Sequence, residues 1–262
     1  MTDGRTDALV IEVKNLVTHY GKRRILDGID FDVRAGEIMV IMGGSGSGKS
    51  TLMRHLLSLQ QATSGSIRVL GKDIAALNTV ERSELYRELG VAFQTGALLS
   101  SLSVGENIML PLTEHTKLDR PTMEIMMRMK LEVVDLAGFE DLMPAELSGG
   151  MTKRAALARA IVMDPKILFC DEPSAGLDPV VSAALDELLL RLRDAMQMSI
   201  VDRITILDHG KVLMVGTVEE VRASKNERIQ NILHRRSEEE ILDIDAYLER
   251  LTGIDIKTEA AL

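Results

Sequence analysis

The chain has 262 residues with a formal net charge of −9, and 45% of them are hydrophobic, enough for a sizeable core. The acidic balance and the few aromatic residues argue against a nucleic-acid binder, which would show a basic face. No apolar run approaches the ~18 residues of a membrane span, and the polar start from Met1 to Thr6 predicts no signal peptide.

The N-terminal part predicts three strands. Leu9 to Tyr20 alternates loosely and is expected to be an edge strand that ends in a turn at Gly21-Lys22. Residues 29–33 alternate more cleanly, and residues 65–71 form a strand bounded by glycines. Tyr20 has two interpretations at this stage, a filler at a strand end or an aromatic that stacks on a base.

Between the second and third of these strands lies the stretch Gly43–Thr51, with the sequence GGSGSGKST. An apolar run, Ile38–Met42, precedes it, and residues 52–57 are apolar at helical spacing. Strand, glycine-rich turn and helix form the context in which G-x-x-x-x-G-K-[ST] binds phosphate, through backbone N–H groups and the helix N-terminus. We therefore expect a nucleotide site, with Lys49 on the phosphates and Ser50 on Mg²⁺, rather than an unliganded Gly/Ser loop.

The middle of the chain changes from strands to helices. Residues 78–81 form a capping pattern, and residues 90–93 predict a buried strand that ends at Gln94. From Thr95 to Leu147 no strand is expected, and Ser103-Val104-Gly105-Glu106 is a capping box. The methionine-rich part of this helical insertion, Met123 to Met129, is expected to be adaptable core, with a partner-facing surface as the alternative.

A second group of motifs follows. Residues 147–151, LSGGM, open an Ala-rich helix that extends through Val162. An apolar run at 167–170 predicts a buried strand that delivers Asp171 and Glu172 to the phosphate site, where an unpaired carboxylate needs a metal or a catalytic use. Its single cysteine, Cys170, is expected to be a buried core thiol in a cytosolic protein. Asp178 and Pro179 are expected to cap and start a helix that ends near Met196.

In this order, the motifs resemble those of ABC-transporter ATPase subunits, over residues 9 to about 222. The resemblance implies an α/β fold of the P-loop NTPase type, with a RecA-like parallel-sheet core, an antiparallel β subdomain and a helical signature subdomain at about 98–163. It implies a nucleotide-binding domain at 1–223 and leaves a helical C-terminal extension at 224–262. It assigns Glu172 as the catalytic base beside Lys49, and Ser50, Gln94 and Asp171 as ligands of Mg²⁺. The ATP contacts that it implies are Tyr20, Gly43, Gly44, Ser45, Gly46, Ser47, Gly48, Lys49, Ser50, Thr51, Gln94, Ser148, Gly149, Gly150 and Asp178.

Within this family, residues 90–112, 147–161 and 171–189 are similar to the phospholipid-trafficking branch of the Mla or Mce type. That resemblance implies a homodimer at the cytoplasmic face of the inner membrane, with two ATP molecules sandwiched head to tail. It also implies a membrane permease docked near Leu98 and Leu99, a periplasmic lipid-binding MCE-type subunit, and a possible small cytosolic accessory subunit, without nucleic acid. The rivals are a soluble ABC protein of the translation-factor or repair type, and a kinase or GTPase-like P-loop enzyme, which would lack the LSGG motif.

The C-terminal extension carries two apolar stripes at helical spacing. One comprises Ile229, Ile232 and Leu233, and the other follows a capping box at 237–240 and runs from Ile241 to Leu251. Packing back on the same domain is one interpretation. We favour the other, in which the tail reaches the sister subunit or an accessory protein.

The resemblance also implies a γ-phosphate histidine on the strand after the Pro179–Met196 helix, and none of the five histidines fits. His209 is expected in a hairpin turn between strands at 204–207 and 211–215. A strand that starts at 199–201 meets Asp202-Arg203 and another strand at once, without the crossover that parallel strands need. We therefore expect a segment to be missing between about Ile200 and Asp202. Either residues are left out and the numbering runs through the gap, which we favour because the other catalytic residues are intact, or the protein is a true deletion with impaired hydrolysis.

Overall fold

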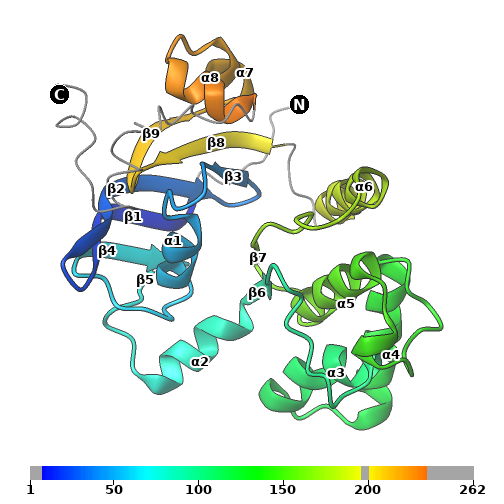
Figure 1. Ribbon diagram of the computed structural model, residues 1–262. Helices are drawn as coiled ribbons and strands as arrows, with labels where there is room; N and C mark the ends of the chain where they lie inside the picture. Colours follow the sequence, from blue (N-terminus) through cyan, green and yellow to red (C-terminus); the bar gives the residue numbers. More distant parts are fainter. Residues whose placement is uncertain (1–7, 196–200, 235–262) are drawn as a thin grey trace, which may run out of the picture.

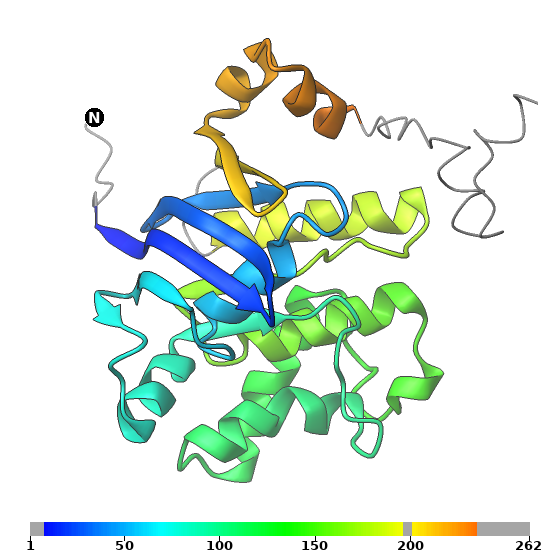
Figure 2. The ribbon, with the colours of Figure 1, turned by 60° about the vertical axis from the view of Figure 1, so that its left-hand side comes forward.

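The structure is a computed structural model that describes residues 8–195 and 201–234 (Figure 1). In Figure 1 the strands β1–β4, β8 and β9 occupy one half of the molecule, and the helices α3–α6 occupy the other. Figure 2 shows the molecule turned by 60°, with α3 and α4 (green) below β1 and β2 (blue). No helix in the described ranges is long and apolar enough to cross a membrane.

The antiparallel sheet has the strand order β2-β1-β4-β5. It is built from β1 (Leu9–Tyr20), β2 (Arg23–Arg34), β4 (Ser64–Val69) and β5 (Lys72–Asp73). The predicted turn at Gly21-Lys22 joins β1 to β2, but β1 lies between β2 and β4, so the prediction of an edge strand is wrong. Its alternation looked loose because several register shifts interrupt the pairing with β2.

The strand that enters the glycine-rich loop belongs to a separate, mixed sheet. In it, β3 (Ile38–Met42) pairs in parallel with β8 (Val201–Asp208), which forms an antiparallel hairpin with β9 (Lys211–Gly216). The predicted hairpin around His209 is confirmed. Within the described residues, β8 continues from Val201 through Asp202 and Arg203 as one strand, with a register shift against β3 at Asp202, so Asp202 and Arg203 do not separate two strands; the predicted start at 199–200 lies outside these residues. Arg203 is held within β8 by ion pairs to Glu37 and Asp32.

The strand that precedes the acidic pair is in a third sheet, where β6 (Leu89–Ala92) pairs in parallel with β7 (Ile167–Cys170). Within residues 8–195 and 201–234, no strand connects β3 to β7. All residues of both strands are only partly buried, whereas a parallel sheet is normally covered and continuous. The parallel core is therefore open between β3 and β7. Residues 196–200, where the missing segment is predicted to start, lie outside the described residues.

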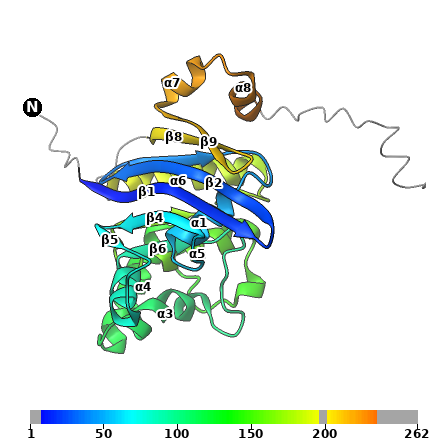
Figure 3. The same cartoon turned by 90° about the vertical axis from the view of Figure 1, so that its left-hand side faces the viewer.

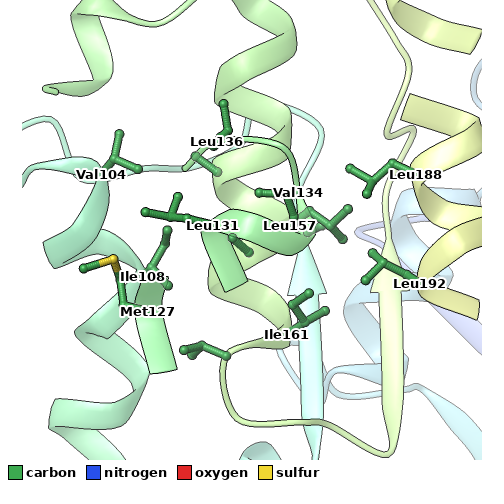
Figure 4. Close-up of a cluster of buried hydrophobic side chains, with 14 of the residues drawn as sticks. Val104, Ile108, Met127, Leu131, Val134, Leu136, Leu157, Ile161, Leu188 and Leu192 are labelled. Carbon is green, nitrogen blue, oxygen red and sulfur yellow. The ribbon is translucent and has the colours of Figure 1, made fainter. Parts of the chain in front are cut away.

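The helical half has its own core. It consists of α3 (Val104–His115), α4 (Arg120–Val133), η1 (Pro144–Glu146) and α5 (Gly149–Ile161), against which α6 (Pro179–Ala195) packs. Figure 4 shows Leu188 and Leu192 of α6 beside Leu157 and Ile161 of α5. Met127 is buried in this cluster, with Met123 and Met126 packed against it, so the core interpretation holds for these three. Met129, in contrast, is 61% exposed.

Capping explains where several of these helices begin. The predicted boxes are present at Asn78, which starts α2 (Thr79–Arg87), and at Ser103, which starts α3. In each, the cap side chain accepts from the backbone N–H of a glutamate three residues later, and that glutamate accepts from the cap residue. Helix α1 (Lys49–Leu56) follows the glycine-rich loop. Its N-cap residue, Gly48, has no side chain to cap it, which leaves the N-terminal N–H groups of the helix available for a ligand.

Two short helices, α7 (Val218–Ala223) and α8 (Glu227–Leu233), sit on the outer side of β8 and β9 (Figure 3). Ile229 is 2% exposed and shares a cluster with Ile206 and Val221. Thus the first apolar stripe of the extension packs back on its own chain, contrary to the interpretation that we favoured. The second stripe, at residues 241–251, lies outside the described residues.

Candidate functional site

The glycine-rich loop between β3 and α1 is shaped by glycines that no other residue could replace without strain. Gly48 has φ 108°, and a Cβ on Gly43 would lie 2.3 Å from the carbonyl oxygen of Leu207. The side chain of Lys49 turns back over the loop and donates to the carbonyls of Gly43 and Gly44, at 2.9 and 3.1 Å. A cation so placed is ready to exchange these carbonyls for phosphate oxygens.

The same loop contains a buried polar atom that fits a phosphate ligand. Ser47 is 3% exposed, and within the described structure its Oγ has no hydrogen-bond partner. Buried hydroxyls are nearly always satisfied, so this one points to a missing acceptor or donor. Gly44, Ser45 and Gly46 form the exposed tip of the loop, and Ser50 and Thr51 lie in the first turn of α1.

The register of β6 and β7 brings two predicted site residues together. Ala92 pairs with Cys170, so Gln94 and Glu172 both lie two residues beyond the same edge. Gln94 Nε2 donates to Glu172 Oε2 at 3.2 Å, and Lys49 Nζ lies 3.8 Å from Glu172 Oε1. Glu172 therefore connects the glycine-rich loop at Gly43–Thr51, called the P-loop below, to the end of β6. Its φ of 44° is uncommon for glutamate, and such local strain is frequent at functional sites.

The first residue of the acidic pair, Asp171, is partly buried next to a second carboxylate and three basic residues. Burial, followed by the neighbouring Glu172, raises the pKa of Asp171 above its usual value, although Lys49, Arg54 and Lys153 act in the opposite direction. Carboxylate, hydroxyl and amide oxygens are the ligands that suit Mg²⁺ shared with phosphates. By residue type, Asp171, Ser50 and Gln94 are compatible with the predicted ion. Cys170, one residue earlier, has its pKa raised to about 12 by burial and is the expected inert core thiol.

The remaining predicted site residues lie at the end of β1, at the start of α5 and at the start of α6, and no hydrogen bond or ion pair joins them to Lys49 or Glu172 within the described residues. Tyr20 ends β1 with 44% of its surface exposed. Ser148 caps α5 by accepting from the N–H of Met151 at 3.3 Å, and both Ser148 and Gly149 are exposed. A Cβ on Gly150 would lie 2.6 Å from Val181, so the start of α5 packs closely on α6. Asp178 caps α6 as predicted, accepting from the N–H groups of Val180 and Val181.

The sequence reasoning missed basic residues that hold the loop after β6. Lys153 donates from its ammonium to the main-chain carbonyl of Gln94, and Arg159 donates to the carbonyls of Gly96 and Ala97. Both residues belong to α5. Lys153 lies four residues after Gly149, and Arg159 lies six residues after Lys153. Their proximity to the LSGG motif was a signal, but their partners lie about sixty residues away in the chain.

A further unpredicted cluster joins the helical half to α6. Asp135 Oδ2 accepts from Arg154 of α5 at 2.9 Å and from Arg191 of α6 at 2.6 Å. Arg191, and to a lesser degree Arg154, hold the pKa of Asp135 below its usual value. The helix that starts at Ser148 and the helix capped by Asp178 are therefore tied together at a shared carboxylate.

The comparisons with known proteins agree with this geometry. The ABC transporter family profile matches residues 26–175. The intermembrane phospholipid transport system ATP-binding protein MlaF of Haemophilus influenzae is 38% identical over 242 residues, which covers 87% of this chain and 92% of that protein. The 242 aligned positions exceed 87% of 262 residues, about 228, so some positions of the alignment have no counterpart in this chain.

Other similar proteins support the same fold. The probable ribonucleotide transport ATP-binding protein mkl of Mycobacterium leprae is 42% identical over 199 residues, which covers 76% of this chain but only 57% of that protein. Among solved structures, the ATP-binding cassette MJ0796, dimeric and bound to ADP and Pi, is 25% identical with a TM-score of 0.71, covering 79% of this chain and 98% of that one. CbiO1 of Clostridium perfringens, part of the cbiONQ complex, is 26% identical with a TM-score of 0.74, covering 94% and 99%.

Proposed function

The chain belongs to the ABC transporter family, and from this premise we propose that it is the ATP-hydrolysing subunit of a phospholipid transport complex. The observation that carries the proposal is the bridge made by Glu172, between Gln94 at 3.2 Å and Lys49 at 3.8 Å. It unites the three segments that ATP hydrolysis requires, a phosphate-binding loop, a carboxylate base and a side chain that senses the bound nucleotide.

In this proposal each residue has a separate chemical role. Lys49 neutralises charge on the β- and γ-phosphates, and the backbone N–H groups of Gly46 to Ser50 bind phosphate oxygens at the start of α1. Glu172 orients the attacking water and accepts its proton, as a general base within hydrogen-bond reach of that water. Asp171, Ser50 and Gln94 would hold Mg²⁺, which supplies charge compensation for the phosphates when bound.

We propose that the working unit is a homodimer. Ser148 and Gly149 are exposed at the start of α5, a helix N-terminus with N–H groups free for an anion. They belong to the helical half, whereas the P-loop belongs to the other half (Figure 1). A second copy arranged head to tail would bring the start of its α5 to this chain's ATP, and MJ0796, which is similar to this chain, is dimeric with ADP and Pi bound. Asp178 would then lie near the same interface.

The proposed position is the cytoplasmic face of an inner membrane, bound to a permease. Phe93 and Leu99, which are 38% and 46% exposed, frame the loop after Gln94, and Leu98 packs beneath them. Apolar residues beside the nucleotide sensor suit a partner that responds to hydrolysis. A periplasmic MCE-type lipid-binding subunit and a small cytosolic accessory protein complete the proposed complex.

Phospholipid is favoured as the cargo because the chain covers 92% of the MlaF protein but only 57% of the mkl protein. The test is a deletion strain examined for phospholipid in the outer leaflet of the outer membrane and, separately, for ribonucleotide uptake. We expect lost lipid asymmetry that the intact gene restores and the Glu172→Gln gene does not. Intact lipid asymmetry with lost ribonucleotide uptake would reject the lipid assignment and retain the transport ATPase.

The rival from another class is a soluble ABC ATPase that acts in translation or repair. Its partners would be ribosomes or DNA, and the net charge of −9 offers little attraction for either. Purification of the tagged protein from membranes separates the two proposals. Recovery of an integral-membrane permease supports transport, and recovery of ribosomes or DNA supports the rival.

A further inference from the structure

The proposed ATP site contains a hydrogen-bonded network that none of the family motifs includes. It begins at His55, which lies on α1, six residues after Lys49, and is fully buried. His55 Nδ1 lies 2.9 Å from the carbonyl oxygen of Gln60, and its Nε2 lies 2.7 Å from Thr18 Oγ1. Since a carbonyl only accepts, Nδ1 carries the proton and Nε2 accepts from the hydroxyl of Thr18.

The network continues from the backbone of Gln60 to its side chain. Gln60 Oε1 accepts from the hydroxyl of Tyr20 at 2.8 Å, so the phenol is held at the end of β1. A second bond supports the same junction, because the N–H of His19 donates to Thr63 Oγ1 at 3.2 Å. The chain after α1 and the end of β1 are thus joined at several points around a buried imidazole.

The hydroxyl of Tyr20 is fixed by a hydrogen bond, whereas much of its side chain is exposed. This hydroxyl donates to the Gln60 side chain, just after α1. The side chain nevertheless remains 44% exposed. An aromatic ring that is anchored through its polar tip retains its faces for stacking.

We propose that Gln60 is a positioning residue for the nucleotide base, because it holds the ring of Tyr20 in the orientation that stacks on adenine. His55 fixes the backbone of Gln60 and thereby sets the base platform relative to the P-loop helix. This inference rests on the proposed ATP site. It adds that base affinity depends on a hydrogen bond that the base itself does not touch. Free rotation of Tyr20 would lower the affinity for ATP without changing the phosphate contacts.

The test compares two ligands, ATP and inorganic tripolyphosphate, on the full-length protein by calorimetry. Tyr20→Phe retains the ring and removes its hydroxyl, and Gln60→Ala removes the acceptor. One neutral hydrogen bond corresponds to roughly 0.5–1.5 kcal/mol, so we expect each change to weaken ATP binding by about 2- to 10-fold. Tripolyphosphate binding should stay unchanged, which a general structural defect would not allow.

Two further variants make the test decisive. The double variant Tyr20→Phe/Gln60→Ala should bind ATP no more weakly than Tyr20→Phe alone, since that single change already removes the bond to Gln60. Tyr86→Phe is the matched control, because the Tyr86 hydroxyl donates to the carbonyl of Leu57 just beyond α1, 3.1 Å away. It should leave both affinities unchanged. Wild-type ATP affinity in Tyr20→Phe, or additive losses in the double variant, would overturn the inference while the ATP site stands. A wild-type protein that binds neither ligand would reject the ATP site itself.

Discussion

Gln94 donates to the carboxylate of Glu172 across 3.2 Å, although the two residues are 78 positions apart in the chain. The contact follows from the parallel register of β6 and β7, which places the residues after each strand at one edge. The side chain of Gln94, which follows β6, thus contacts the proposed catalytic base, which follows β7. Because the amide donates and the carboxylate accepts, the bond would persist with a glutamine at position 172.

This persistence leads to the first prediction, for Glu172→Gln. The variant keeps the shape and the hydrogen bond to Gln94 but has no carboxylate to accept a proton. We expect ATP turnover to fall at least about 100-fold, the usual size of a general-base contribution. ATP binding should remain, and ATP should trap a dimer that size-exclusion chromatography detects. Wild-type turnover in this variant would reject Glu172 as the base.

Lys49→Ala should produce the opposite pattern, a defect in binding. The Lys49 ammonium covers the loop and reaches two carbonyls at 2.9 and 3.1 Å. Hydrogen bonds to charged groups contribute about 1.5–3 kcal/mol, so we expect about 10- to 100-fold weaker ATP binding by fluorescence titration. Lys72→Ala is the control, because Lys72 lies on β5 in an exposed ion pair with Glu84, and this variant should bind ATP normally. Equal affinities for the two variants would contradict the assignment.

Much of this site could be predicted from the sequence because its motifs are local. The P-loop, the acidic pair after an apolar strand and the caps at Asn78, Ser103 and Asp178 each depend on neighbours within a few residues. What the sequence did not predict depends on distant pairing. The interior position of β1, the contact of Lys153 with Gln94 and the cluster around Asp135 each join segments that periodicity cannot relate.

The buried imidazole of His55 predicts a pH-dependent stability. Burial lowers its pKa from 6.5, although the bond to Gln60 acts in the opposite direction. The folded state therefore binds fewer protons than the unfolded state just below this value. Stability should be complete above about pH 6.5 and decline as the pH falls through that value toward the folded-state pKa.

Urea midpoints measured between about pH 7.5 and about pH 5.5 check this dependence. We expect the midpoint to decrease with falling pH in the wild type and to change less in His55→Gln. His209→Gln is the matched control, because the His209 side chain is 81% exposed, and it should keep the wild-type dependence. An unchanged slope in His55→Gln would assign the pH effect to other groups.

The packing of α8 predicts that the extension serves its own domain first. Ile229 is 2% exposed, and Arg228 forms a bidentate ion pair with Asp208, at 2.8 and 3.0 Å, at the end of β8. We expect Ile229→Ala to reduce the free energy of unfolding by about 2–4 kcal/mol. A chain that ends after His234 should be as stable as the full chain in the same urea titration. If that shorter chain also forms the ATP-bound dimer normally, the proposed role of the tail in dimer assembly is wrong.

The open core between β3 and β7 predicts slow hydrolysis. Neither strand has a partner on its facing edge within the described ranges, yet Lys49 and Glu172, which follow these strands, come within 3.8 Å of each other. Neighbouring strands lie about 4.8 Å apart, and we expect an additional strand between β3 and β7 to close the sheet.

We therefore expect the purified protein, with an intact mass of 28.8 kDa, to bind ATP but to hydrolyse it slowly. Insertion of a segment with a strand, a histidine and a short helix between Ile200 and Asp202 should raise both the urea midpoint and the ATPase rate. The matched control carries the same insert with its histidine replaced by alanine. It should gain the stability, because the sheet is closed, but not the rate, because the group facing the γ-phosphate is absent. A mass above 28.8 kDa would mean that residues are missing from the sequence, and a wild-type rate equal to that of the inserted chain would show that hydrolysis proceeds with the sheet open.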